Sequence, residues 1–154
     1  MKKLLLIIFS IVLSSNSYAG EVDINIKKLK ALNSCENCNL KEANLSKANL
    51  SDVNLKGALL YKANLSQANL FFANLSKANL LRANLYKADL RWANLSGANL
   101  TKVNLTGADL SDADLSSSDL SDANLSNADL SNANVDLAKF CNTLTPWGID
   151  DSGC

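Results

Sequence analysis

The chain contains no histidine, and this absence removes the commonest general base from its chemistry. Without histidine, neither a Ser-His nor a Cys-His nucleophile can be assembled. An excess of one charge is also missing, because the chain has 15 basic and 15 acidic side chains. That balance argues against strong electrostatic steering toward nucleic acid. The 154 residues are enough for one domain.

Long hydrophobic runs are absent except for one near the N-terminus, from Leu4 to Leu13. M-K-K precedes this run and S-S-N-S-Y-A-G follows it, which is the pattern of a cleavable secretory signal peptide over residues 1–19. Ser17 and Ala19 fill the two positions that signal peptidase reads, so we expect cleavage after Ala19. The run is too short to span a bilayer, so a retained anchor is the weaker alternative. No cysteine follows the cut, which argues against a lipoprotein.

Cleavage removes Lys2 and Lys3 and leaves 13 basic and 15 acidic side chains, a net charge near −2. These charges are unevenly distributed along the chain. Nine basic and three acidic side chains lie from Lys41 to Lys102, whereas seven aspartates and no basic residue lie from Asp109 to Asp136.

Internal repetition dominates the rest of the chain. From Leu40 to Leu130 a leucine recurs every five residues, and Val135 closes a series of twenty units. The residue two before this central position is Ala in sixteen units; the exceptions are Val53, Val103, Cys38 and Ser118. The residue just before the centre is Asn in fourteen units, Asp in five and Leu59 in one.

A period of five fits neither an amphipathic helix nor a strand. In extended backbone the small residue and the leucine point the same way, and the Asn or Asp between them points outward. Four polar corners then close a square coil of twenty residues. Residues 36–137 are thus predicted to form an all-β solenoid of about five coils, roughly 24 Å tall. We reject low-complexity disorder, because burial of the in-phase apolar side chains contributes a gross stabilisation of order 40 kcal/mol.

The units A-N-L-S-K and A-D-L-S-D resemble the A-(D/N)-L-x-x repeat of the pentapeptide-repeat family. The resemblance implies a right-handed quadrilateral β-helix with Ala and Leu inside. The flanks S-C-E-N-C-N-L and F-C-N-T-L-T-P-W-G-I-D-D-S-G-C resemble those of secreted members with cysteine-containing caps. The family has no common activity, although some members mimic DNA and protect or inhibit topoisomerases.

Both ends of such a solenoid need caps, because end coils expose apolar side chains and unpaired backbone. Apolar residues spaced by four, three and three predict a short amphipathic helix from Asp23 to Leu32, within an N-terminal cap of residues 20–35. At the other end, Phe140 continues the apolar pattern into a cap of residues 138–154, with a turn at Thr145–Gly148.

Four cysteines in an exported chain favour two disulfides, which we assign as Cys35–Cys38 and Cys141–Cys154. A redox C-x-x-C motif would need a thioredoxin-like setting, which is lacking. A zinc site of four cysteines would need both pairs near one ion, but they lie at opposite ends of the rod. A buried free thiol at Cys38 stays open as an alternative. We expect no metal and no other cofactor.

Residues twenty apart stack in columns, so the repeat can be read as a surface map. Phe71 is predicted beneath Arg91, and Phe72 beneath Trp92, which places a cation against one ring and stacks two others. Exposed apolar groups flanked by cations often mark interaction sites. The candidate binding surface is an apolar and basic belt made of Leu59, Tyr61, Lys62, Phe71, Phe72, Leu81, Arg82, Tyr86, Arg91 and Trp92. The alternative is that these side chains only brace the outer ladder or lie under a terminal segment.

Two other columns have a chemical interpretation. Asp89, Asp109 and Asp129 offer carboxylates to a cation such as Ca²⁺, with Asp112 nearby, but three monodentate groups fall short of the six oxygens that calcium prefers. A solvated acidic face is therefore favoured. The outward Asn columns are expected to form amide ladders along the rod.

The sequence thus favours a non-enzymatic, periplasmic or secreted binding or structural module, expected to be a monomer. Its partner is expected to be an envelope or extracellular protein or a glycan, and not nucleic acid. A DNA-mimic topoisomerase inhibitor is the alternative from the family, but it would need a cytoplasmic, strongly acidic protein. A hydrolase would need paired carboxylates in a cleft, which a convex rod does not offer.

Overall fold

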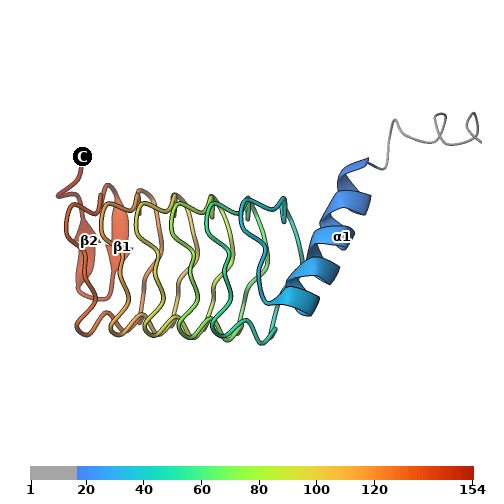
Figure 1. The fold of residues 1–154 in the computed structure, drawn as a ribbon. Coiled ribbons are helices and arrows are strands. Elements are labelled where there is room, and N and C mark those ends of the chain that lie inside the picture. The colour runs from blue at the N-terminus through green and yellow to red at the C-terminus, as the bar shows by residue number, and fades with distance from the viewer. Residues whose placement is uncertain (1–16) are drawn as a thin grey trace, which may run out of the picture.

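The computed structural model describes residues 17–154, and its body is a rod of stacked coils (Figure 1). Isolated parallel bridges join residues twenty positions apart, from Ser34↔Asn54 to Asn124↔Leu144. This ladder begins before and ends after the predicted solenoid of residues 36–137. The predicted signal peptide, residues 1–19, lies outside the described residues except for its last three.

Each five-residue unit consists of a short extended segment and a β-turn. At Leu70, the N–H donates to the Asp89 carbonyl of the next coil at 2.7 Å, and the Leu70 carbonyl accepts from the Ala73 N–H at 2.9 Å. The second corner residue, Phe72, has φ 56°, as a type II turn requires at that position. Positive φ values recur at the equivalent residue of the other corners, including Gly57 and Gly97.

The Ala and Leu positions fill the interior of the rod, as predicted. Leu70, Leu75 and Ala73 are completely buried, and the same holds for the repeat in general. Ser118 replaces an inward Ala, and its buried hydroxyl has no hydrogen-bond partner among residues 17–154. That hydroxyl is an isolated polar group in an apolar core.

The outward Asn or Asp of each unit caps the corner that follows it. Asn69 Oδ1 accepts a hydrogen bond from the Phe71 N–H at 3.1 Å, and the same contact recurs in most other units. The expected amide ladders occur as well, for example between Asn69 Nδ2 and Asn49 Oδ1 at 3.2 Å. Asn and Asp therefore occupy this position because each side chain satisfies a corner N–H.

Helix α1, Ser17–Leu32, lies against the N-terminal end of the rod (Figure 1). It begins earlier than the predicted start at Asp23, because the apolar spacing marks only the part of the helix that packs against the coils. Leu29 is fully buried there. Asn25 Nδ2 donates to the Asn39 carbonyl at 2.9 Å, which ties the helix to the first coil. No helix in residues 17–154 is long and apolar enough to cross a membrane.

At the C-terminal end, strand β1, Thr143–Thr145, continues the ladder, and strand β2, Gly148–Asp150, pairs with it antiparallel. The turn between them confirms the one predicted at Thr145–Gly148. The structure also places both predicted cysteine pairs in disulfide bonds, Cys35–Cys38 with Cα atoms 5.3 Å apart and Cys141–Cys154 with Cα atoms 4.7 Å apart.

Candidate binding surface

Two of the predicted surface aromatics occupy a corner because the repeat has already filled the interior. Ala68 and Leu70 take the inward positions of their unit, so Phe71 and Phe72 form the corner that follows. Phe71 is half-buried, whereas Phe72 is 51% exposed. The prediction that this pair lies outside the core is confirmed.

We call the cluster of Phe71, Phe72, Arg91 and Trp92 the aromatic corner. The rings of Phe71 and Phe72 meet edge to face with centroids 4.5 Å apart. Phe72 stacks on Trp92 of the next coil at 5.9 Å with an interplanar angle of 25°. The guanidinium carbon of Arg91 lies 5.2 Å from the centre of the Phe71 ring. The last two contacts are the ones predicted from the twenty-residue columns, and together the three contacts join four side chains from two coils.

Two members of the aromatic corner occupy the left-handed turn position of their units. Phe72 has φ 56° and Trp92 has φ 60°, and the equivalent residues of the other corners, most of them polar or charged, also have positive φ values. Trp92 is 53% exposed, about as much as Phe72. The corner therefore presents two large rings to solvent from a turn position that most other units fill with a polar or charged residue or with glycine.

Arg91 connects the aromatic corner to the neighbouring column of Asp89 and Asp109 by ionic contacts. Its Nε and Nη2 donate to the two carboxylate oxygens of Asp89 at 2.8 and 2.7 Å, and Nε also lies 3.7 Å from Asp109 Oδ2. The hydrogen bond from Arg91 lowers the pKa of Asp89, although partial burial opposes this shift. The Arg91 guanidinium thus lies between Asp89 and Asp109, two of the three carboxylates considered above as calcium ligands. Among residues 17–154 no cluster of side chains suited to a metal occurs.

Four of the other predicted surface residues belong to a second corner, which we call the basic corner: Tyr61, Lys62, Leu81 and Arg82. Lys62 Nζ lies 5.2 Å from the centre of the Tyr61 ring and 3.9 Å from Glu42 Oε1 of the preceding coil. Further along the same column, Lys102 pairs with Asp122 at 3.8 Å. All of these pairs are solvent-exposed, so each contributes little to stability.

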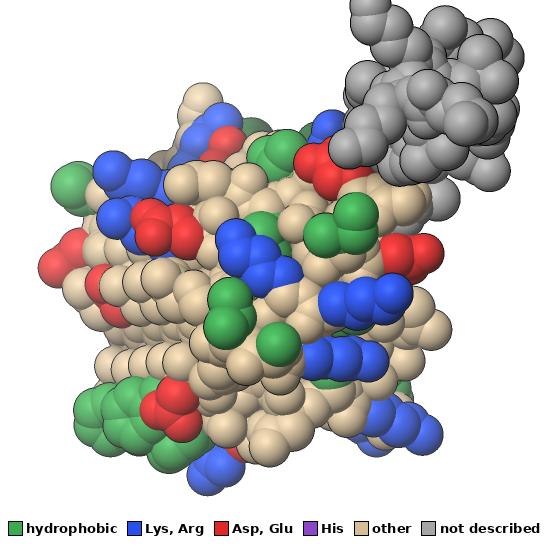
Figure 2. Space-filling view, turned by 45° about the vertical axis from the view of Figure 1, so that its right-hand side comes forward, with side chains coloured by type: hydrophobic (Ala, Val, Ile, Leu, Met, Phe, Trp, Pro, Cys, Tyr) green, Lys and Arg blue, Asp and Glu red, His purple; other side chains and the backbone are tan. Residues whose placement is uncertain are grey.

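The aromatic corner and the basic corner do not form one continuous surface. Tyr61 and Phe71 are ten residues apart, which is half of a twenty-residue coil, so the two corners lie diagonally across the rod. Tyr86 occupies a corner between them, where Lys87 Nζ lies 5.3 Å from its ring. Figure 2 shows one face on which hydrophobic side chains stand in separate groups among charged and polar ones. The predicted belt therefore extends over three corners of the rod.

Acidic rather than basic residues surround the aromatic corner. Asp52 and Asp112 occupy the same turn position one coil before Phe72 and one coil after Trp92, with φ 54° and 58°. Arg91 is the basic side chain of the cluster, and Asp89 pairs with it. The cations of the predicted belt thus belong mainly to the basic corner.

Leu59 is the one predicted surface residue that breaks the Asn/Asp pattern. It is half-buried between Asn39 and Asn79 in the bridge ladder. Because leucine has no acceptor, the Tyr61 N–H lacks the side-chain hydrogen bond that Asn79 supplies to Leu81 in the next coil at 3.1 Å. The corner after Leu59 therefore has one hydrogen bond fewer than the neighbouring corners.

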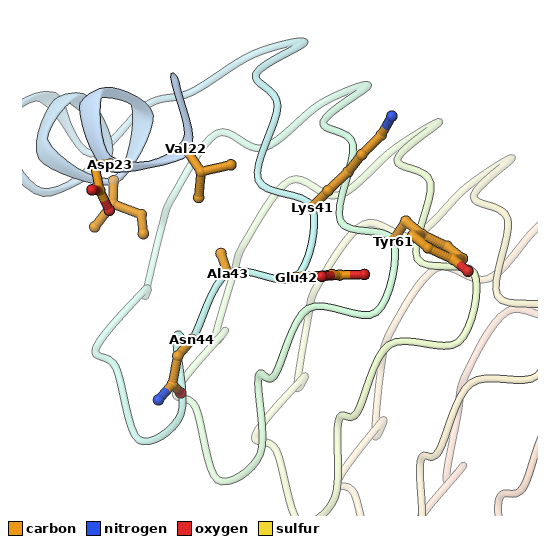
Figure 3. Close-up of a pocket in the computed structure, with 8 residues that line it drawn as sticks. Val22, Asp23, Lys41, Glu42, Ala43, Asn44 and Tyr61 are labelled. Atoms are coloured by element: carbon orange, nitrogen blue, oxygen red, sulfur yellow. The ribbon is translucent and has the colours of Figure 1, made fainter. Parts of the chain in front are cut away.

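A groove that the sequence did not reveal lies between α1 and the first coils. It encloses about 700 Å³, and the apolar residues that line it are Val22, Ile26, Ala43 and Tyr61. Figure 3 shows Lys41 and Tyr61 extending from the coils and Val22 and Asp23 coming from the helix. The 4-residue spacing of Val22 and Ile26 was visible in the sequence, but the angle at which the helix meets the coil was not.

The geometry defines a solenoid of five-residue repeats with its variable residues at the corners. The family profile described as pentapeptide repeats matches residues 38–71, 63–101, 98–135 and 108–143. This chain therefore belongs to the pentapeptide-repeat family, whose members form right-handed quadrilateral β-helices and are generally structural or binding proteins. The comparison with curated proteins found no match.

Several solved structures of the family are similar to this chain. HetL from Nostoc sp. strain PCC 7120, involved in heterocyst differentiation regulation, is 30% identical, with 75% of this chain and 77% of that chain covered and a TM-score of 0.45. A second Nostoc pentapeptide repeat protein is 34% identical over 74% of each chain, also with a TM-score of 0.45. A protein of the Arabidopsis thaliana thylakoid lumen is 30% identical, covering 63% and 64%, with a TM-score of 0.41.

Proposed function

We propose that this chain is an exported, non-enzymatic binding module whose partner contacts the aromatic corner. The observation that carries this proposal is the pair Phe72 and Trp92, each about half exposed at a turn position that most other units fill with a polar or charged residue or with glycine. Large apolar side chains in such places expose surface that a solitary rod has no need to expose.

The stability of the rod does not require this pair. A charged residue, as at Lys77 or Asp112, or glycine, as at Gly57, occupies the same turn position in other units. The stacked contact of Phe72 and Trp92 contributes only about 0.5–1.5 kcal/mol beyond burial. A partner that covers the rings supplies the reason for retaining them.

Export is supported by two features of the chain. Residues 1–19 have the charged start, apolar run and small residues of a signal peptide. Both disulfides are compatible with an oxidising compartment. The structure places Ala19 inside α1, and a peptidase that reads an extended substrate would therefore act before this helix forms. In the processed chain, α1 would cap the N-terminal end of a rod of about five coils.

The partner we propose is an envelope or extracellular protein or a glycan. A DNA mimic would need a strongly acidic surface, whereas the processed chain has a net charge near −2 and a corner built on Lys62, Arg82 and Lys102. Exposed rings next to Asp52 and Asp112 present an apolar surface with hydrogen-bond acceptors beside it. Such a surface suits a partner that offers apolar groups and hydrogen-bond donors.

Capture from a cell-envelope extract tests the binding proposal. The wild-type chain is compared with a triple variant, Phe71→Ser, Phe72→Lys and Trp92→Gly, and with a matched control at the basic corner, Tyr61→Ser and Leu81→Ser. We expect the aromatic-corner variant to lose a captured component that the wild type and the control variant retain. Equal capture by all three chains would refute the aromatic corner as the contact surface.

Export is tested separately by the mass of the chain recovered from outside the cytoplasm. The proposal expects a chain that begins at Gly20 and carries both disulfides. An intact chain that begins at Met1 and stays in the cytoplasm would contradict it.

A further inference from the structure

The last turns of the solenoid leave a row of backbone donors without partners. In the preceding coil, the N–H groups of Leu110 and Leu115 donate to the carbonyls of Asp129 and Asn134 at 2.7 Å each. One coil later, the equivalent donors have no acceptor among the described residues; they are the N–H groups of Asn127, Leu130, Asn132, Val135 and Leu137. We call residues 127–137 the open edge. Such an edge is a template for an added strand.

An apolar groove runs beside the open edge. It encloses about 330 Å³, and its lining includes Leu130, Ala133, Val135 and Trp147. Trp147 is 69% exposed, and Leu137, at the end of the edge, is 89% exposed. The hairpin of β1 and β2 therefore covers only part of this end of the rod, and the predicted C-terminal cap leaves one side of the end open.

The open edge can pair with an extended segment along one side of the coil. There the N–H groups of Asn127 and Leu130 lack acceptors, and the Ala128 carbonyl lacks the donor that the equivalent Ala108 carbonyl has one coil earlier in the Asp129 N–H. An antiparallel segment can satisfy these groups with its own carbonyls and N–H groups. A second copy of this chain offers the same groups, so the charges around the groove decide between the two occupants.

The charges around the groove disfavour self-association. Asp150 lines the groove, and Asp129 and Asp136 lie on the open edge. Hydrogen bonds from Ser131 and Ser152 lower the pKa values of Asp129 and Asp150, so both carboxylates are ionised at neutral pH. Lys139 is the one basic residue from position 103 to the end of the chain. Two copies would bring like charges together, whereas a basic partner would be attracted.

We propose that the open edge and its groove bind an extended, basic segment of another protein by strand addition. The segment runs along one side of the square coil, where its backbone carbonyls accept from the N–H groups of Asn127 and Leu130 and its apolar side chains lie against Trp147. Its lysine or arginine side chains approach Asp129 and Asp150. This site lies at the end of the rod and is separate from the aromatic corner on its side.

The probe is a synthetic peptide, acetyl-Lys-Val-Lys-Val-Lys-Val-amide, compared with its counterpart in which glutamate replaces each lysine. The full chain is produced under disulfide-forming conditions and carries Trp92→Gly, which leaves Trp147 as the only tryptophan. Peptide binding is followed by Trp147 fluorescence and by hydrogen exchange of backbone amides. Because this background lacks Trp92, failure of this site and failure of the aromatic corner are distinguishable.

We expect the basic peptide to slow exchange at Asn127 and Leu130 by at least about tenfold, as a hydrogen-bonded strand does. Asp129→Asn should weaken binding about threefold, as loss of one exposed charge pair does. Asp52→Asn, a matched change at a distant exposed position, should leave binding unchanged. Equal binding of both peptides, or unchanged exchange at the edge, would overturn the proposal. Concentration-dependent protection of the edge without peptide would also overturn it, in favour of self-association.

Discussion

Replacing Leu59 by asparagine should make the rod more stable. Leu59 occupies the outward position that is Asn or Asp in the other nineteen units. The Tyr61 N–H consequently lacks a side-chain acceptor, unlike the Leu81 N–H one coil later. In the next coil, Asn79 Oδ1 accepts from the Leu81 N–H at 3.1 Å. Leu59→Asn should create the same contact at the corresponding corner, one coil earlier.

The expected magnitude follows from the bonds gained and the packing lost. One hydrogen bond to a corner N–H contributes about 1 kcal/mol. The new amide can also join a ladder with its neighbours, as Asn104 Nδ2 does with Asn84 Oδ1 at 3.1 Å. Leu59 is only half-buried, so its removal offsets part of this gain. We expect a net increase of about 1 kcal/mol in the free energy of unfolding.

The measurement is the midpoint of chemical denaturation together with hydrogen exchange at the amides of Tyr61 and Leu81. The matched reverse change, Asn79→Leu, removes the existing contact and should lower stability by about 1 kcal/mol while speeding exchange at Leu81. If Leu59→Asn leaves Tyr61 exchange unchanged, or if Asn79→Leu has no effect, the outward amide does not stabilise the corner and the reasoning fails.

Three further changes test other parts of the structure. Ser118→Ala should raise the unfolding free energy by about 1 kcal/mol, because it removes a buried hydroxyl without a partner; a lower denaturation midpoint would contradict this. Phe72→Gly should change stability by less than about 1 kcal/mol, since relief of backbone strain offsets lost stacking, and a loss above 2 kcal/mol in calorimetry would show that the ring braces the coils. Asp89→Asn should cost about 0.5 kcal/mol at pH 7 and less at pH 2. The pKa of Asp89 is lowered in the folded state, so its stabilisation is present above the usual carboxyl range and disappears as the pH falls through the lowered value; equal stability differences at both pH values would refute it.

The fold was predictable from the sequence because one residue type marks each structural position. Leucine every five residues fixed the period, and the twenty-residue column placed Phe72 against Trp92 without any coordinates. The start of α1 was not predictable in the same way. Apolar spacing reports only the packed face of a helix, and the first turns of α1 extend beyond that face.

The candidate site was only partly predictable. Columns of residues twenty apart correctly joined Phe71 to Arg91, and the ten residues between Tyr61 and Phe71 already placed them half a coil apart, so the belt was drawn over more than one corner. The open edge at Leu130 and Val135 was also missed, since an unpaired backbone donor has no side-chain pattern in the sequence.

The central claim is that this chain, once exported, binds a partner through its aromatic corner. Site-specific photo-crosslinking in the expressing cells tests this claim most directly. A photoreactive side chain is introduced at position 72 and, as a control, at position 117, where Ser117 has the same φ of 56° on another corner. The account predicts a discrete crosslinked partner outside the cytoplasm from position 72 and none from position 117. No crosslink from position 72, or the same product from both positions, would contradict it.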